Sequence, residues 1–299
     1  MTCFAVLLSD ELSTDVLQSA EYSIELAGGD IEALRVLSDA PAALELTISG
    51  LDARATRTAL HDALADVAVD VCTEDAVDDA RPRRGLLLMD VDSTLVAGEV
   101  IDSLAAHAGK GAEVAAVTER AMRGELDFRE SLHARVATLA GLPSSVIDDV
   151  RAALQLSPGA RTLIATAQHA GCIVGAVSGG FSQILDPLAD EIGLDFAAAN
   201  QLEIEDGVLT GRVVGEVVDR AAKADHLRRL AEINGLTRAE TVAVGDGAND
   251  LDMLAEAGVG IAYNAKPLVQ IEAPATLNQP GLDGVLLLLG IPRDAFVTP

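Results

Sequence analysis

Tryptophan is absent from this sequence, and aromatic residues make up only 2% of its 299 residues. Hydrophobic residues still make up 49%, so a core of alanine, valine, leucine and isoleucine is expected. This composition is common in α/β proteins, in which parallel strands are buried on both faces. Length and composition together predict a folded protein with two domains, or with one domain that carries a sizeable insertion.

Cysteine is scarce as well. The three cysteines, Cys3, Cys72 and Cys172, lie far apart and show no C-x-x-C spacing. This pattern argues against a disulfide framework and against a zinc site. Each cysteine lies in an apolar run, so we expect buried thiols in a reducing compartment.

Basic residues are outnumbered, because 47 acidic residues oppose 21 basic ones and the net charge is −26. Such a surface repels phosphate backbones and anionic lipids, so we expect no nucleic-acid partner and no membrane partner. The N-terminus lacks the basic region of a signal peptide, and the apolar run VLLLLGI at Val285–Ile291 is too short to span a bilayer. A cytoplasmic location is therefore predicted.

Residues 1–80 predict a small domain with the order strand, helix, two strands, helix, strand. The strands are TCFAVLLS, IEALRVLSD, ALELTISG and VAVDVCTED, and the helices begin after Ser13 or Thr14 and at ARATRTALHDALAD. This is the order of the ferredoxin-like fold, and the pattern resembles an ACT domain, a regulatory module that often binds amino acids. The loop SDELSTD lacks the glycine and proline of the usual ACT ligand turn. Amino-acid binding and a purely structural role, such as forming a homodimer, therefore both stay open.

A charged linker over residues 81–85 leads to a second domain over residues 86–299. Four runs, GLLLMDV, CIVGAVS, TVAVGD and GVGIAY, are apolar throughout and alternate with helical segments, which predicts an α/β fold with a doubly wound parallel sheet. The first crossover is far longer than one helix needs, and its helical pattern predicts an inserted cap at about residues 98–168. A later segment with Asp206–Gly207 between two β-like runs predicts a hairpin.

Polar residues follow several of these strands. In open α/β sheets ligands bind at the carboxyl ends of the strands, so we expect the side chains there to converge. They are Asp90 and Asp92 after the first strand, Ser178, Gly179 and Gly180 after the second, and Asp246, Asn249 and Asp250 after the third, with Lys223 in a nearby helix. Carboxylate oxygens suit Mg²⁺, and glycine amides with an ammonium group suit a phosphoryl group.

The motifs D-V-D-S-T, V-S-G-G-F and G-D-G-A-N-D, with a lone lysine between the last two, resemble the phosphoserine phosphatases of the haloacid dehalogenase superfamily over about residues 86–270. The resemblance implies Mg²⁺-dependent hydrolysis of O-phospho-L-serine to L-serine and phosphate, the last step of serine biosynthesis. It implies that Asp90 is the nucleophile, which forms an aspartyl-phosphate, and that Asp92 is the general acid and base. The implied metal ligands are the Asp90 carboxylate, the Asp92 main-chain carbonyl and Asp246.

The same resemblance implies how the phosphoryl group is held. Ser178, Gly179, Gly180 and Lys223 would bind its oxygens as charge redistributes. Asn249 and Asp250 would orient the substrate or the water molecules around the metal, with Asp250 in the outer shell of ligands.

The cap would recognise the amino-acid end of the substrate. Glu99 would bind the serine ammonium group, Arg135 its carboxylate, and Phe128 would form an apolar wall. Arg129 is an alternative to Arg135, because sequence alone does not set the phase of the helix. Two other functions stay open: a phosphatase or phosphotransferase of the same superfamily that acts on another small phosphomonoester, and an amino-acid sensor with a silent phosphatase domain.

Overall fold

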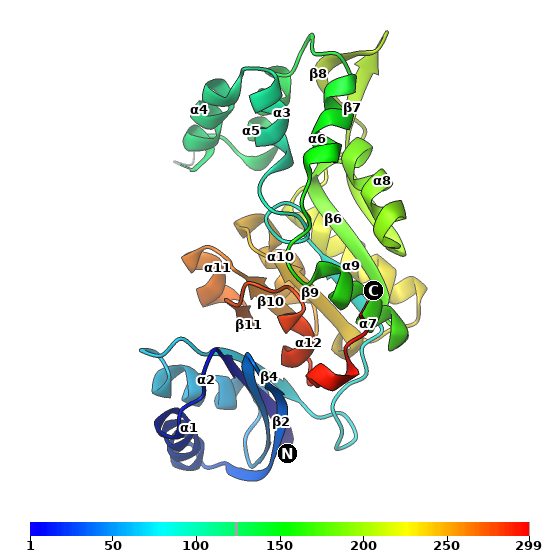
Figure 1. Cartoon of the computed structure of the whole chain (residues 1–299). Helices are drawn as coiled ribbons and strands as arrows, with labels where there is room; N and C mark the ends of the chain where they lie inside the picture. The colour runs from blue at the N-terminus through cyan, green and yellow to red at the C-terminus, as the bar shows by residue number, and fades with distance from the viewer. Residues whose placement is uncertain (123–124, 299) are drawn as a thin grey trace.

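The computed structural model describes residues 1–122 and 125–298. A four-stranded sheet lies at one end, a seven-stranded sheet in the middle, and a group of helices at the other end (Figure 1). The prediction of an α/β sheet that carries a helical insertion and follows an antiparallel N-terminal domain is confirmed. No helix in the described part of the chain is long and apolar enough to cross a membrane.

The N-terminal sheet has the order β2-β3-β1-β4, and each neighbouring pair of these strands is antiparallel. Two helices cover one face of it, and their first turns are capped by the side chains of Ser13 and Asp52. The elements are β1 (Thr2–Ser9), α1 (Thr14–Leu26), β2 (Asp30–Asp39), β3 (Ala42–Ser49), α2 (Ala53–Ala63) and β4 (Asp70–Asp75). This is the βαββαβ order that the sequence predicts.

Strand β1 is buried on both faces. Cys3, Ala5 and Leu7 pack in the cluster beneath α1 and α2, whereas Val6 and Leu8 pack in the cluster that includes the C-terminal part of the chain. Successive side chains of a strand point to opposite faces, so the two sets separate by alternation. The run TCFAVLLS is therefore apolar throughout because each face meets a different core.

Residues 81–85 are not a free linker. Arg81 pairs with Glu45 at 2.9 Å and with Glu74, and Arg84 also pairs with Glu74; both arginine side chains are at most 15% exposed. Arg81 Nη1 also donates to the Leu288 carbonyl at 3.3 Å. A buried charge cluster thus docks the N-terminal domain against the second domain, because each buried charge needs its partner in place.

The central sheet has the order β11-β10-β9-β5-β6-β7-β8, and every neighbouring pair is parallel except β7 with β8. The four predicted parallel strands are β5, β6, β9 and β10, while the pairing of β7 with β6 and the presence of β11 were not anticipated. The strands are β5 (Leu86–Met89), β6 (Ile173–Phe181), β7 (Phe196–Glu205), β8 (Val208–Val214), β9 (Thr241–Gly245), β10 (Val259–Tyr263) and β11 (Ala275–Leu277).

Helices connect and cover these strands. The α-helices are α7 (Ala160–His169), α8 (Ser182–Ile192), α9 (Arg220–Ile233), α10 (Leu251–Glu256), α11 (Pro267–Glu272) and α12 (Gly284–Leu288), and the short 3₁₀ turns are η1 (Arg238–Glu240), η2 (Ala248–Asp250) and η3 (Arg293–Ala295). The apolar run at Val285–Ile291 begins in α12 and extends past its end, and its buried leucines share a cluster with Val6 and Leu8 of β1. Its hydrophobicity serves the contact between the two domains.

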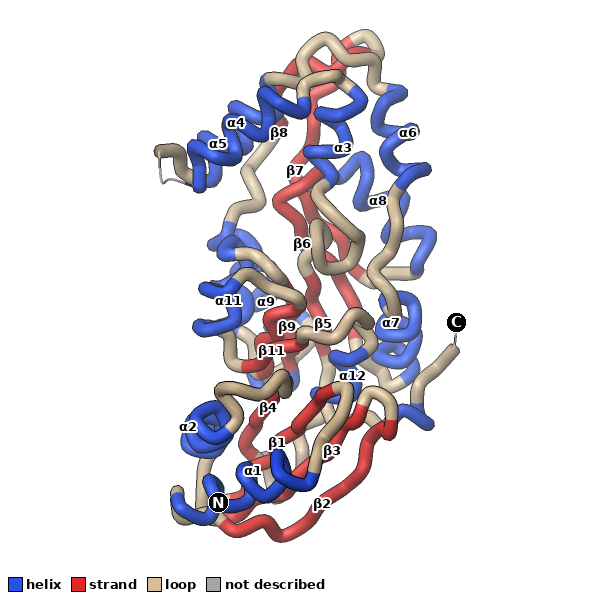
Figure 2. Tube along the Cα trace, turned by 60° about the vertical axis from the view of Figure 1, so that its left-hand side comes forward, coloured by secondary structure: helices blue, strands red, loops and turns tan. Residues whose placement is uncertain are grey.

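Four helices form the cap, which lies at the end of the molecule opposite the N-terminal sheet (Figure 2). They are α3 (Val100–His107), α4 (Gly111–Met122), α5 (Phe128–Ala137) and α6 (Ser145–Ala153). Their buried side chains share one cluster with Leu202 and Leu209 of the β7–β8 hairpin, whereas α7 packs in the cluster of the central sheet. We therefore propose cap bounds of 100–153 plus the hairpin, instead of 98–168.

The predicted hairpin is present. Asp206 and Gly207 form its two-residue turn with φ values of 52° and 76°. Positive φ at both central positions is the type I′ geometry that matches the twist of the flanking strands. The hairpin carries the central sheet into the cap.

Candidate active site

Asp90 stands directly after β5, and its amide donates to the Val244 carbonyl of β9 at 2.9 Å. The Lys223 Nζ lies 2.6 Å from Asp90 Oδ1 and 2.6 Å from Asp250 Oδ1, and the lysine side chain is fully buried. Helix α9 supplies this lysine one turn after its N-cap, Asp219. Three elements that are distant in sequence therefore meet at one ammonium group.

The charges in this group perturb one another. Burial raises the pKa of Asp90, and the nearby Asp250 raises it further, while Lys223 opposes the rise. Burial lowers the pKa of Lys223, but the ion pairs with Asp250 and Asp90 outweigh burial and raise it. Lys223 therefore retains its proton more firmly than an ordinary lysine. Its ammonium group binds Asp90 Oδ1 and leaves the other oxygen, Oδ2, without this contact.

Asp92 is held from two sides. Its Oδ1 accepts a hydrogen bond from the Val100 amide at 2.7 Å, and its Oδ2 accepts one from Ser178 Oγ at 3.2 Å. Desolvation raises the pKa of Asp92 despite these hydrogen bonds. A carboxyl group that retains its proton more readily than an ordinary aspartate is suited to general acid catalysis.

The segment Ser178–Gly180 ends β6 beside Asp92. A Cβ on Gly180 would lie 2.8 Å from Asp92 Oδ2, and a Cβ on Gly179 would lie 2.9 Å from Phe128 Cζ. Both positions therefore need glycine because core and cap approach the backbone closely. The Gly180 amide donates to Ser178 Oγ at 2.7 Å.

Asn200, a buried residue of β7, fixes this segment and was missed by sequence reasoning. Its Nδ2 donates to the Gly179 carbonyl at 2.8 Å, and its Oδ1 accepts from the Val218 amide at 2.8 Å. An asparagine inside an apolar strand is the signal that could have revealed it, because a buried amide needs hydrogen-bond partners.

Three carboxylates could hold a cation. Ligand oxygens of Asp90, Asp246 and Asp250 lie within 4.8 Å of one another. Asp250 is largely committed, since its Oδ1 binds Lys223 and its Oδ2 accepts from the Gly247 amide at 2.9 Å. Burial and then Asp250 raise the pKa of Asp246 to about 6. Asp90 and Asp246 therefore fit a hard divalent cation directly, with Asp250 behind them.

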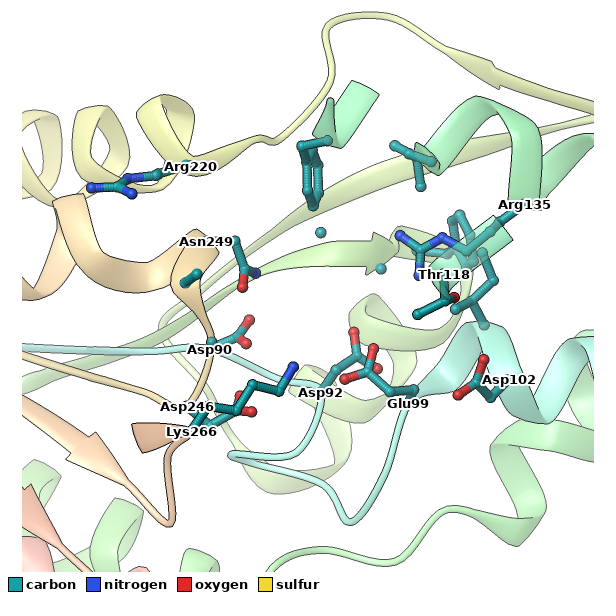
Figure 3. A pocket seen from close by; sticks show the side chains of 18 residues that line it. Asp90, Asp92, Glu99, Asp102, Thr118, Arg135, Arg220, Asp246, Asn249 and Lys266 are labelled. Atoms are coloured by element: carbon teal, nitrogen blue, oxygen red, sulfur yellow. The ribbon is translucent and has the colours of Figure 1, made fainter. Parts of the chain in front are cut away.

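A cavity of about 490 Å³ opens between this group and the cap. Asp90, Asp92, Gly179, Gly180, Asp246 and Asn249 line it from the core, and Glu99, Phe128 and Arg135 line it from the cap side. Figure 3 shows the Arg135 guanidinium reaching into this space across from Glu99. Ser178, Lys223 and Asp250 do not line this cavity in the described structure. Ser178 is hydrogen-bonded to Asp92, and Lys223 is bound to both Asp90 and Asp250.

Glu99 lies at the start of α3. Desolvation, followed by the charges of Asp92 and Asp246, raises its pKa to about 7. Arg129, the alternative to Arg135, does not line the cavity; its Nε donates to Asp219 Oδ2 at 2.9 Å. Of the two arginines, Arg135 is the one that can meet a ligand carboxylate there.

Among the lining residues that were not predicted, four have polar or charged side chains: Asp102, Thr118, Arg220 and Lys266. Arg220 is paired with Asp252 at 2.5 Å and points away from the cavity (Figure 3). Lys266 follows β10, and its charge opposes the rise in the pKa of Asp246. A lysine just past the end of a parallel strand is the signal that could have identified it.

Comparison with known proteins supports this geometry. The family of haloacid dehalogenase-like hydrolases matches residues 87–255. A phosphoserine phosphatase of Streptomyces coelicolor is 52% identical over 289 residues, which cover 96% of this chain and 70% of the relative. A phosphoserine phosphatase of Mycobacterium tuberculosis is 50% identical over 296 residues, which cover 96% of this chain and 71% of that relative.

Solved structures agree. A probable phosphoserine phosphatase from Vibrio cholerae, in unliganded form, superposes with a TM-score of 0.74 at 35% identity, covering 98% of this chain and 88% of that one. A substrate-bound phosphoserine phosphatase complex superposes with a TM-score of 0.65 at 40% identity, covering 69% of this chain and 98% of that one. The chain belongs to the phosphoserine phosphatase family of the haloacid dehalogenase-like hydrolases.

Proposed function

We propose that this protein hydrolyses O-phospho-L-serine to L-serine and inorganic phosphate, with Mg²⁺ as cofactor, as the last step of serine biosynthesis. The observation that carries the proposal is the division of one cavity. Asp90 and Asp92 line its core side, while Glu99 and Arg135 line its cap side. The core side suits a phosphate ester, and the cap side suits the ammonium and carboxylate groups of an amino acid.

In the first step, Asp90 Oδ2 attacks the phosphorus in line with the ester oxygen. The bond from phosphorus to the serine oxygen breaks, and the Asp92 carboxyl transfers its proton to that oxygen. The products are neutral serine hydroxyl, an aspartyl-phosphate at Asp90 and the carboxylate of Asp92. Lys223 keeps Asp90 Oδ1 in place and offsets negative charge.

In the second step, the Asp92 carboxylate takes a proton from a water molecule that attacks the phosphorus of the aspartyl-phosphate. The acyl-phosphate bond breaks, Asp90 is regenerated as a carboxylate, and Asp92 recovers its proton. Ser178 and Gly180, which are hydrogen-bonded to each other, keep Asp92 and the adjoining amides in position for both steps.

Asp90, the main-chain carbonyl of Asp92 and Asp246 would hold Mg²⁺, with Asp250 in the outer shell. When bound there, the cation supplies positive charge that offsets repulsion between the nucleophilic carboxylate and the phosphate. The fit rests on carboxylate oxygens that lie within 4.8 Å of one another. Burial and then the negative charge of Asp250 raise the pKa of Asp246, and a bound cation would offset both.

The cap side would set specificity. Glu99 pairs with the serine ammonium group and Arg135 with its carboxylate, while Phe128 excludes water from the apolar wall. Asn249 lies on the core side of the cavity and would orient the ester (Figure 3).

Phosphate release from phosphoserine, measured with and without Mg²⁺, tests the proposal. We expect turnover that requires Mg²⁺ and that Asp90→Asn reduces by at least about 10⁴-fold. Faster turnover of another small phosphomonoester would favour the related phosphatase, and transfer to an added alcohol would favour the phosphotransferase. Absence of turnover in the wild-type protein would favour a sensor with a silent domain.

We also propose a homodimer formed through the N-terminal domain and a cytoplasmic location. Strand β2 lies at an edge of its sheet, with Leu34 54% exposed and Val36 57% exposed, and an unpaired edge can accept another strand. Light scattering of the wild-type protein and of Val36→Lys tests the dimer; a monomeric wild-type protein contradicts it.

The cysteines support the proposed cytoplasmic location. All three are free and buried, which fits a reducing compartment.

A further inference from the structure

An ion pair joins the cap to the core beside the cavity. Arg129, the second residue of α5, places Nε 2.9 Å and Nη2 2.8 Å from the same oxygen of Asp219, Oδ2. The arginine side chain is 58% exposed, and the aspartate side chain is 19% exposed. Among the ion pairs between described residues, this is the one that links the four cap helices to the core.

The two oxygens of Asp219 serve different elements. While Oδ2 holds the cap, Oδ1 accepts a hydrogen bond from the Ala222 amide at 3.0 Å and so caps α9. The next residue of that helix is Lys223, which binds Asp90. One carboxylate therefore contacts the cap and also begins the helix that carries the lysine of the active site.

The surroundings make this position rigid. The residue before Asp219, Val218, donates its amide to Asn200, which also holds Gly179. On the cap side, Asp127 and Glu130 form a capping box around the first turn of α5. Phe128 touches Gly179 in the same region, so the N-terminal turn of α5 contacts the core at the rim of the cavity.

We propose that Arg129 and Asp219 form a latch that holds the cap over the cavity, and that both are positioning residues for substrate binding. When the latch is intact, the closed form that presents Glu99 and Arg135 to the substrate is more populated. Weakening it lowers the fraction of binding-competent protein and raises KM by the same factor. The chemical groups around Asp90 stay unchanged, so kcat is unchanged, or rises where cap opening limits product release.

A double-mutant cycle tests the latch. Arg129→Gln removes the charge of the cap residue, and Asp219→Asn removes that of the core residue while its side-chain oxygen still caps α9. Each single variant should raise KM about two- to five-fold, as expected for a partly exposed ion pair, and the double variant should add no further loss. Raising the salt concentration should erase the difference between wild type and variants.

A matched control is Arg161→Gln, which breaks the exposed pair of Arg161 with Glu191, formed between α7 and α8 without either latch residue. It changes the net charge by the same amount and sign as Arg129→Gln and should leave KM unchanged. Losses that multiply in the double variant, or a fall in kcat at constant KM, would overturn the latch.

The latch rests on the proposed function only in the choice of phosphoserine as substrate. Measuring KM with both phosphoserine and p-nitrophenyl phosphate distinguishes the latch from the proposed activity. If the protein hydrolyses p-nitrophenyl phosphate but not phosphoserine, the proposed substrate is wrong and the effect of the latch on KM can still be measured. Hydrogen exchange gives a readout that needs no turnover: the Val100 amide should exchange faster in all three latch variants, while the Ala222 amide stays protected. Equal exchange of Val100 in wild type and variants contradicts the latch.

Discussion

The carboxylate of Asp92 binds the first residue of the cap helix α3, with its Oδ1 2.7 Å from the Val100 amide. Its other oxygen lies 3.2 Å from Ser178 Oγ in the core. The group proposed to transfer protons therefore touches the cap and the core at once. The environment of Asp92 is therefore complete when α3 is in place, as in the closed form that would bind the substrate, so loosening the cap should act on KM before it acts on kcat.

Asp92→Asn should separate the two chemical steps. Asparagine still accepts from the Val100 amide but cannot supply a proton, so turnover of phosphoserine should fall by about 10²- to 10⁴-fold. Nitrophenolate leaves without protonation, so p-nitrophenyl phosphate should give a burst close to one equivalent of enzyme, followed by slow hydrolysis of the aspartyl-phosphate. Stopped-flow absorbance measures the burst; equal losses for both substrates and no burst would exclude this role.

Glu99→Gln should impair phosphoserine selectively. Losing the pair with the ammonium group should raise KM for phosphoserine by about ten-fold or more, whereas p-nitrophenyl phosphate has no ammonium group and should change little. Because the pKa of Glu99 is raised to about 7, the wild-type kcat/KM for phosphoserine should fall as the pH drops below 7. The variant should lose this difference between the two substrates, and an unchanged pH profile would argue against ammonium recognition by Glu99.

Mg²⁺ should stabilise the fold more at pH 8 than at pH 5, because Asp246 binds a cation in its deprotonated form. The folded-state pKa values of Asp246, about 6, and Glu99, about 7, are raised above their unfolded values. Their contribution to stability is therefore complete below about pH 4 and is lost as the pH rises through 6 and 7. Saturating Mg²⁺ at 100 times its Kd adds about 2.7 kcal/mol. Differential scanning calorimetry should show a smaller Mg²⁺ response and a flatter pH dependence for Asp246→Asn; a Tm in the wild type that ignores Mg²⁺ is the contrary result.

Lys266→Gln should slow capture of the phosphate ester. Lys266 lines the cavity, and no ion pair joins it to another residue in the described ranges, so its charge is available to an incoming anion in a protein of net charge −26. We expect kcat/KM to fall by about two- to ten-fold and to depend less on salt. Lys110→Gln is the control, because Lys110 pairs with Glu113 on the cap surface. Identical salt dependence in wild type and Lys266→Gln would refute the role.

Much of this molecule follows from local sequence. Apolar runs bounded by helical segments predict β5, β6, β9 and β10, because strands covered on both faces carry no alternation. The φ preferences of Asp206–Gly207 predict the hairpin, and polar residues after three strands predict where the site lies. These features depend on a residue and its near neighbours, so they can be recognised without knowing the contacts.

The tertiary structure decided what depends on side chains that are distant in sequence. Arg129 and Arg135 lie six residues apart in one helix, and only packing of α5 against the core turns Arg135 into the cavity and Arg129 onto Asp219. Likewise, residues 81–85 have the composition of a linker, yet the side chains of Arg81 and Arg84 are at most 15% exposed because Glu74 lies beside them. The sequence by itself determined the types of the catalytic groups and their order along the chain. Packing determined which of them meet, because burial and pairing are properties of the assembled fold.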